Sequence, residues 1–413
     1  MRLHAKGLIA IALFFCSLLL AQDKVDIGER HLIKSELLQQ NRVLDIYLPS
    51  SHQTSQKKYP VLFILDGQWH FANGVAIQKS LRVPDRLPEM IVVGIHSENP
   101  LRLTLFGNER EKFLSFLQEE VIPYINANFK ATDERILFGW EAAAIFSGYA
   151  ILHKSQLFNG AIMTNGAYVT QQMIEEFLEL DPMAERYLFI ANTDKDIYSV
   201  RGSDAFAELL GNKAPATLIW KYEKFNDEIH ESLPYLALYH GLNHYFHNYQ
   251  SLVFANIEEF HNLGGIPYLK SYYLKRGKRF GLDPKIDNSV KNALIWLSWN
   301  RDDFESFQFF MDAFKDVLTT KRYTSAYWQN RFGQFYLKHG DYENAIHYFK
   351  IGISQYPERS WLAKMHNGLG KAYFKKGNQK LAKSNLKKAM EIARKNKDAQ
   401  FEDYKKDFTV LRK

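Results

Sequence analysis

The sequence predicts an α/β domain with a doubly wound, mostly parallel sheet, followed by an all-α domain of helical repeats. Three observations lead to this prediction. Continuous apolar runs, typical of strands buried on both faces, alternate with helical stretches over residues 43–260. Beyond about residue 265 the strand pattern stops. Two segments near the C-terminus then resemble each other at a period typical of helical repeats.

The length and composition allow two domains and an N-terminal export signal. The chain has 413 residues, of which 46% are hydrophobic, enough for a full α/β core and a smaller second unit. Residues 1–21 place two cations before an uncharged apolar run, as in a cleaved signal peptide. That run is shorter than the roughly 20 apolar residues of a membrane-spanning helix. We therefore expect an exported, periplasmic or secreted protein with no membrane span, and no disulfide, because the single cysteine is Cys16.

The formal net charge of +7 is concentrated late in the chain, in residues 270–279 and 371–397. Such clusters can contact an acidic polymer or nucleic acid, but helical repeats commonly solvate their outer faces in this way. We predict no nucleic-acid partner.

The strands of the α/β domain can be followed in order. Residues 43–48 alternate between apolar and polar side chains, which indicates an early edge strand. Residues 59–65 and 90–95 are continuous apolar runs and indicate buried parallel strands. Apolar side chains then recur at helical spacing between residues 113 and 125. Further strands are expected at 135–138, 160–163, 187–190 and 217–220.

The most informative motif is a strand, tight turn and helix around Phe138-Gly139-Trp140-Glu141-Ala142-Ala143-Ala144. It has the outline of a nucleophile elbow, in which a sharp turn exposes the central side chain and small neighbours let the helix pack closely. Gly139 and Ala143 keep that smallness. Serine is expected at the centre, but this chain has Glu141.

The C-terminal segments are tetratricopeptide-like repeats, expected at about 326–359 and 363–396. Gly333, Ala345, Gly370 and Ala382 supply the small residues at which paired helices touch. A degenerate repeat is expected around 293–314, because roughly three units are needed for a stable stack. We assign residues 23–265 to the α/β domain and 266–413 to the helical domain.

Residues 43–260 resemble the esterase branch of the α/β-hydrolase superfamily, which includes enterochelin-esterase-like, S-formylglutathione-hydrolase-like and feruloyl-esterase-like enzymes. The resemblance rests on the elbow and on three segments, 59–67, 91–95 and 113–125. Proteins that join this domain to C-terminal tetratricopeptide repeats form a known subgroup. The resemblance implies an α/β-hydrolase fold and carboxylic-ester hydrolase chemistry; no organic cofactor is expected.

The family order of serine, acid and histidine implies that His230 is the base, in a loop after the strand at 217–222. The acid stays open at this point. Asp194 and Asp196 follow the strand at 187–191, whereas Asp227 and Glu228 are local alternatives beside the histidine.

An oxyanion site would use the backbone N–H of Ala142 and a second N–H from the loop after residues 61–65. The second donor is expected near Gly67, Gln68 or Trp69. We expect His70 and Trp140 to line the same pocket.

Three hypotheses account for Glu141. The site is a former esterase pocket that binds an ester, acyl or glycoside-like ligand without turnover, with Glu141 paired to His230 or to a cationic ligand. Alternatively, Glu141 is itself the nucleophile or the base of an active ester hydrolase. In the third hypothesis a displaced serine acts instead, and the nearest candidates are Ser147, Ser199 and Ser203. In all three the repeats are expected to engage a protein partner.

His240, His244 and His247 share one helical face at i, i+4 and i+7. No carboxylate at ligand spacing accompanies them. We therefore predict structural histidines and no metal site.

Overall fold

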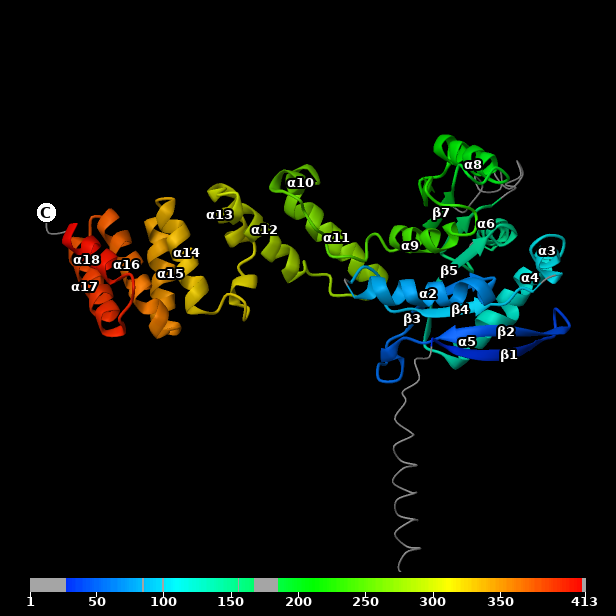
Figure 1. Ribbon diagram of the computed structural model, residues 1–413, viewed down its shortest axis with the longest axis horizontal. Coiled ribbons are helices and arrows are strands. Elements are labelled where there is room, and N and C mark those ends of the chain that lie inside the picture. The colour runs from blue at the N-terminus through cyan, green and yellow to red at the C-terminus, as the bar shows by residue number, and fades with distance from the viewer. Residues whose placement is uncertain (1–26, 84, 99, 155, 167–184, 411–413) are drawn as a thin grey trace, which may run out of the picture. The chain divides into compact units, whose positions relative to one another are not determined.

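The computed structural model describes residues 27–83, 85–98, 100–154, 156–166 and 185–410 (Figure 1). These residues form two compact units, the first ending at Gln250 and the second beginning at Ser251. Residues 251–265, which we had assigned to the first domain, therefore belong to the second unit. The expected signal peptide at 1–21 lies outside the described residues. No described helix is long and apolar enough to cross a membrane.

The first unit is built on an eight-stranded sheet with the order β1-β2-β4-β3-β5-β6-β7-β8. An antiparallel hairpin, β1 (Glu29–Ser35) and β2 (Gln40–Tyr47), forms one edge, and β2 is antiparallel to β4. The other strands run parallel to one another. They are β4 (Ile91–Ile95), β3 (Tyr59–Leu65), β5 (Ala131–Trp140), β6 (Gly160–Thr164), β7 (Arg186–Asn192) and β8 (Leu218–Lys224).

This sheet confirms the predicted fold class, a mostly parallel α/β-hydrolase sheet followed by helices. One expectation about it was wrong: the edge strand is β1, and β2 lies inside it. The sequence of β1, Glu-Arg-His-Leu-Ile-Lys-Ser, is polar and largely exposed, as suits an edge. It therefore lacks the apolar run by which the inner strands were found.

Helices cover both faces of the sheet, as the alternation of side chains along the strands shows. On one face α2 (Gly67–Arg82) packs at Gly74 against Leu62 and Ile64, and α9 (Leu233–Tyr245) packs at Gly241 against Ile162. The intervening side chains of the same strands join the main core with α6 (Ala142–His153). The other α-helices in the described part of this unit are α3 (Leu101–Phe106), α4 (Arg110–Phe116), α5 (Ile122–Asn128) and α8 (Val200–Lys213).

The second unit is entirely helical in its described part. Its helices are α10 (Ile257–Asn262), α11 (Gly265–Phe280), α12 (Asn288–Asn300), α13 (Phe304–Ala313), α14 (Ala326–Lys338), α15 (Tyr342–Gln355), α16 (Arg359–Lys375), α17 (Gln379–Asn396) and α18 (Phe401–Val410). Gly333 of α14 lies against the ring of Phe349, and Gly370 of α16 lies against Leu386. The small residues thus let each helix pair pack closely. The pair α12 and α13 lies where the degenerate repeat was expected.

Candidate functional site

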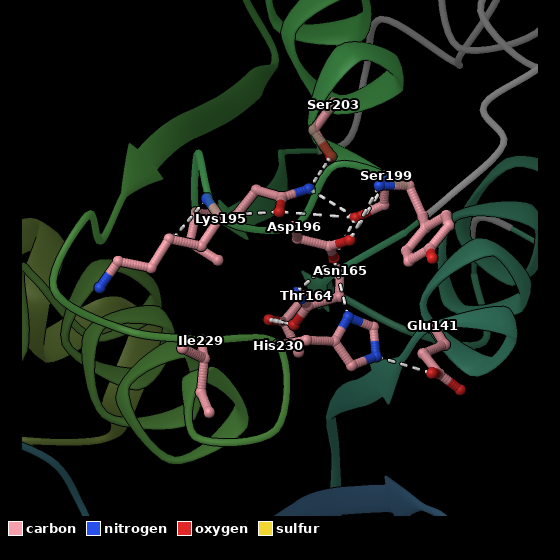
Figure 2. Close-up of polar contacts among 12 residues, drawn as sticks. Glu141, Thr164, Asn165, Lys195, Asp196, Ser199, Ser203, Ile229 and His230 are labelled. Carbon is pink, nitrogen blue, oxygen red and sulfur yellow. Dashed lines mark hydrogen bonds and ion pairs between the residues drawn. The ribbon is translucent and has the colours of Figure 1, made fainter.

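Five polar side chains gather at one edge of the parallel sheet. Each follows the carboxyl end of a strand: Asp66 follows β3, Glu141 follows β5, Asn165 follows β6, Asp196 lies in the loop after β7 and His230 in the loop after β8. Parallel strands end at the same edge of a sheet, which is where open α/β folds place their binding crevices. The topology therefore brings together residues that are far apart in the sequence, and Figure 2 shows four of the five: Glu141, Asn165, Asp196 and His230.

The turn at Glu141 has the strained backbone of an elbow. Glu141 has φ 54° and ψ −120°, a region that costs a residue with a side chain about 1–3 kcal/mol. Asp66 and Asn165, at the ends of the neighbouring strands, also have positive φ. Gly139 permits the turn, because a Cβ there would lie 2.1 Å from the carbonyl oxygen of Ala143. The elbow predicted from the sequence is therefore built, with a carboxylate at its apex.

His230 lies between two carboxylates (Figure 2). Its Nε2 is 2.7 Å from Glu141 Oε1, and its Nδ1 is 2.8 Å from Asp196 Oδ2. Burial lowers the pKa of His230, but hydrogen bonds and charges from Asp196 and Glu141 outweigh this and raise it above its ordinary value. Because both partners accept hydrogen bonds, the arrangement favours the imidazolium, which donates from both nitrogens.

Asp196 is the acid that the structure places beside His230. Its side chain is fully buried and accepts hydrogen bonds from Asn165 Nδ2 at 2.8 Å and Ser199 Oγ at 2.5 Å. Burial raises the pKa of Asp196, but these bonds and His230 bring it below its ordinary value, so the carboxylate is ionised at neutral pH. Asp194 points elsewhere and lies 2.8 Å from Lys224 Nζ.

The alternative acids beside the histidine have other hydrogen-bond partners. Glu228 accepts a hydrogen bond from Ser232, and the backbone carbonyl of Asp227 accepts one from Lys195. Neither residue is bonded to His230 in the part of the chain that the structure describes.

Arg102, a residue that the sequence analysis missed, holds the other oxygen of Glu141. Its Nη1 is 3.0 Å from Glu141 Oε2, and its Nη2 donates to the Trp140 carbonyl at 3.0 Å. Nε and the same Nη2 donate to the two carboxylate oxygens of Asp66 at 2.9 Å each, as a bidentate pair. Glu141 is thus clamped between two cations, with one of its oxygens on each.

The surroundings of Arg102 explain why the guanidinium remains charged. Burial lowers the pKa of Arg102, but Asp66 and Glu141 raise it above its ordinary value. Burial likewise raises the pKa of Asp66, and the charge of Arg102 opposes this rise. The rings of Trp69 and Trp140 each lie 5.6 Å from the guanidinium. In the sequence, Arg102 could have been found as the one charged residue in the apolar stretch 101–106.

The expected oxyanion donors lie beside this clamp. Among the described residues, the N–H groups of Ala142 and Gln68 have no hydrogen-bond acceptor, whereas Trp69 N–H donates to the Asp66 carbonyl at 2.9 Å. The Gln68 side chain bonds twice to the backbone of Ser97, at 2.9 and 3.0 Å. Gly67 allows close approach, since a Cβ there would lie 2.5 Å from the backbone of Gly94.

His70 and Trp140 form an aromatic wall behind the site. The His70 ring lies 5.5 Å from both Phe138 and Trp140, and Trp140 lies 5.1 Å from His230. Burial lowers the pKa of His70 to about 4, so its imidazole is neutral at pH 7. Trp69 is the exposed member of the group.

The candidate replacement serines have other partners. Ser147 Oγ donates to the Ala143 carbonyl at 2.8 Å, Ser199 binds Asp196, and Ser203 accepts from Asn192 at 2.7 Å. None of the three hydroxyls is bonded to His230 in the described part of the chain. The geometry therefore gives no support to a displaced serine nucleophile.

His240 and His244 lie on α9, whereas His247 lies beyond the end of this helix at Tyr245, and the three side chains face different partners. His240 Nδ1 faces Glu223, His244 Nε2 faces the Ile219 carbonyl, and His247 Nδ1 faces the His244 carbonyl. The described residues contain no group of three or more metal-ligating side chains that could hold an ion.

We predict that Arg102→Met lowers the free energy of unfolding by about 3–5 kcal/mol, because it leaves the buried Asp66 without its cation. Lys112→Met is the control, since Lys112 lies 4.0 Å from Glu109 in a half-exposed pair and should cost less than about 1 kcal/mol. Urea denaturation of the full chain measures both. Equal, small losses in the two variants would contradict a clamp that stabilises the site.

We predict that His230 titrates above its ordinary value of about 6.5 and that Glu141→Gln lowers its pKa. A histidine whose pKa is raised by folding stabilises the folded protein at pH values below the pKa of the unfolded state. This stabilisation is lost as the pH rises through the raised pKa of the folded state. NMR titration of the imidazole tests both statements. Glu223→Gln, which removes the carboxylate facing His240 instead, is the control. An unchanged pKa in Glu141→Gln would contradict the pairing.

Comparison with known proteins identifies the family of each part of the chain. A family model described as "Putative esterase" matches residues 35–255, and a tetratricopeptide repeat model matches residues 363–396. The uncharacterized protein YbbA of Bacillus subtilis (strain 168) is 30% identical over 144 residues, which are 31% of this chain and 58% of YbbA. The match thus spans less than two thirds of that relative.

Two solved structures share the fold. One, an IroE-like serine hydrolase from Shewanella oneidensis, has a TM-score of 0.53 at 20% identity and matches 69% of this chain and 98% of its own. The other, an uncharacterised protein from Capnocytophaga ochracea DSM 7271, has a TM-score of 0.57 at 17% identity, over 93% of this chain and 99% of its own. Because the esterase model covers more than half of the sequence, the chain belongs to this esterase family, with a tetratricopeptide repeat near its C-terminus.

Proposed function

We propose that this chain is an exported member of the esterase family that binds an ester, acyl or glycoside-like ligand without turning it over. In this proposal the helical unit engages a protein partner. The observation that carries the proposal is Glu141, which stands at the nucleophile position with one oxygen on His230 and the other on Arg102.

Turnover by a serine-type site needs a hydroxyl nucleophile and a histidine whose Nε2 accepts its proton. Here Nε2 faces a carboxylate at 2.7 Å, and an imidazolium cannot act as a base. For Glu141 to attack an ester carbonyl, a carboxylate oxygen would have to leave Arg102 or His230. Both contacts lower the reactivity of the carboxylate, so the site favours binding over catalysis.

The features that suit a ligand remain. The N–H groups of Ala142 and Gln68 can donate to a carbonyl oxygen. Apolar side chains flank the charged centre: Trp69 is 49% exposed, and Ile229, beside His230, is 51% exposed. A neutral ligand with a carbonyl group and an apolar body fits these surroundings better than an anion, because Glu141 would repel a carboxylate.

An active ester hydrolase is the second candidate. It is favoured by the spatial arrangement of Glu141, His230 and Asp196, in the positions of nucleophile, base and acid. The hydrogen-bond distances are 2.7 Å from Glu141 to His230 and 2.8 Å from His230 to Asp196.

Hydrolysis of short-chain p-nitrophenyl esters separates the two candidates. We expect the wild type to match Glu141→Ala, and Glu141→Ser to exceed both by at least about tenfold, because a hydroxyl then faces His230. The double variant Glu141→Ser, His230→Ala is the control and should lose the gain. Wild-type turnover that disappears in both Glu141→Ala and His230→Ala would show instead that Glu141 is catalytic.

Export rests on the signal-like pattern of residues 1–21. We expect the protein recovered from a bacterial host's periplasm or medium to begin near residue 22, by mass spectrometry of its N-terminal peptide. A cytoplasmic protein that retains Met1 would contradict export.

A further inference from the structure

We propose that the helical unit binds an acidic segment of a partner protein, containing aromatic or aliphatic residues, in a lysine-lined groove on α14 and α16. This inference rests on the part of the proposed function that gives the helical unit a protein partner, and it names the chemistry of that partner. Its test uses the full-length protein with substitutions confined to the helical unit, so it can fail while the ester prediction holds.

The groove is a cavity of about 430 Å³ within the helical unit. Leu337 and Phe374 supply an apolar lining, and the Phe374 ring is 41% exposed. Lys338, Lys371 and Lys375 border the same cavity. A cavity that combines exposed apolar surface with three ammonium groups suits a segment in which apolar and acidic side chains are interspersed.

The lysines occupy related positions in the two repeats. Lys338 ends α14 and Lys375 ends α16, and Lys371 lies one turn before Lys375 on the same face. A lysine at a helix C-terminus also complements the helix dipole. That role alone does not explain why these lysines lie beside the exposed ring of Phe374.

Two of the three ammonium groups are available to a ligand. Lys375 has no ion-pair partner among the described residues. Lys338 pairs with Asp302 at 2.6 Å, but both side chains are at least half exposed, so the pair can exchange at little cost.

The chain itself shows how this face holds a carboxylate. Asp407 of α18 also lines the cavity, and its Oδ2 lies 2.7 Å from Lys371 Nζ and 2.8 Å from Asn367 Nδ2. One ammonium and one amide therefore bind one carboxylate oxygen. A partner's glutamate or aspartate can make equivalent contacts with Lys375 and Lys338.

The groove continues beyond this cavity. A second cavity of about 520 Å³ lies between α12 and α14, and Lys338 lines both. Arg331 and Gln334 of α14 add a cation and an amide there. The two cavities together provide a path for an extended segment rather than for a single side chain.

The charge distribution favours an acidic partner. Residues 251–413 contain 30 lysines and arginines and 17 aspartates and glutamates, a formal +13. Residues 1–250 contain 23 and 29, a formal −6, so the basic character belongs to the helical unit. Such a field attracts an acidic partner and speeds its association. Nucleic acid is less favoured, because its binding sites commonly stack bases on exposed aromatic rings and use arginine. Phe374 is the exposed ring of the first cavity, and Arg331, the arginine of the second cavity, already lies 4.8 Å from the Trp299 ring.

Fluorescence anisotropy with a labelled random copolymer of glutamate and tyrosine tests the proposal, because the copolymer samples many local arrangements of acidic and aromatic residues. We expect the full-length protein to bind it, more weakly as salt rises from about 0.05 to 0.3 M. Lys338→Glu and Lys375→Glu should each weaken binding at least about tenfold. Phe374→Ser should weaken binding of the copolymer more than that of polyglutamate.

Lys383→Glu on α17 is the matched control. Lys383 is exposed and lines neither cavity, and its reversal changes the net charge equally, so binding should stay within about twofold. An equal loss in Lys383→Glu and Lys375→Glu would overturn the proposal in favour of diffuse attraction. So would a copolymer that does not bind, or a single-stranded oligonucleotide that binds more tightly through Lys338 and Lys375. Circular dichroism confirms that each variant is folded.

Discussion

The clamp on Glu141 is the interaction on which the rest of the candidate site depends. A strained turn holds the carboxylate where two cations converge, with one oxygen on His230 and the other on Arg102. Asp66 and Asp196 then complete a chain of three acids and two cations. Charges in a poorly solvated site are tolerated only when each has a partner. The same pairing that stabilises the chain raises the pKa of His230 and occupies its Nε2, the atom that takes the proton in serine-type ester hydrolysis.

The backbone of the elbow does not depend on the chemistry of its apex. The close approach at Gly139, the approach of Gly67 to Gly94 and the N–H groups of Ala142 and Gln68 are properties of the main chain. They persist with glutamate in place of serine. Fold and function are therefore separable in this protein, and the activity has to be argued from the side chains at the sheet edge.

The two units carry opposite formal charges, and their candidate sites differ accordingly. In the α/β unit, N–H groups that can donate to a carbonyl oxygen lie beside a network in which each charged side chain has a partner of opposite charge. The helical unit has three lysines beside an exposed ring, and one of them, Lys375, has no ion-pair partner among the described residues. We propose a small neutral ligand for the first site and an acidic protein segment for the second.

The sequence by itself determined the fold class, the elbow with its glutamate, the histidine loop and the helical repeats, because these depend on local patterns: apolar runs, small residues at fixed offsets and turn spacing. Only the tertiary structure decided between Asp194 and Asp196, which follow the same strand two positions apart but point to different partners. Arg102 also needed the structure. It lies 39 positions before Glu141 on a six-residue helix, and a contact made by folding the sheet edge together leaves no periodic signal along the chain.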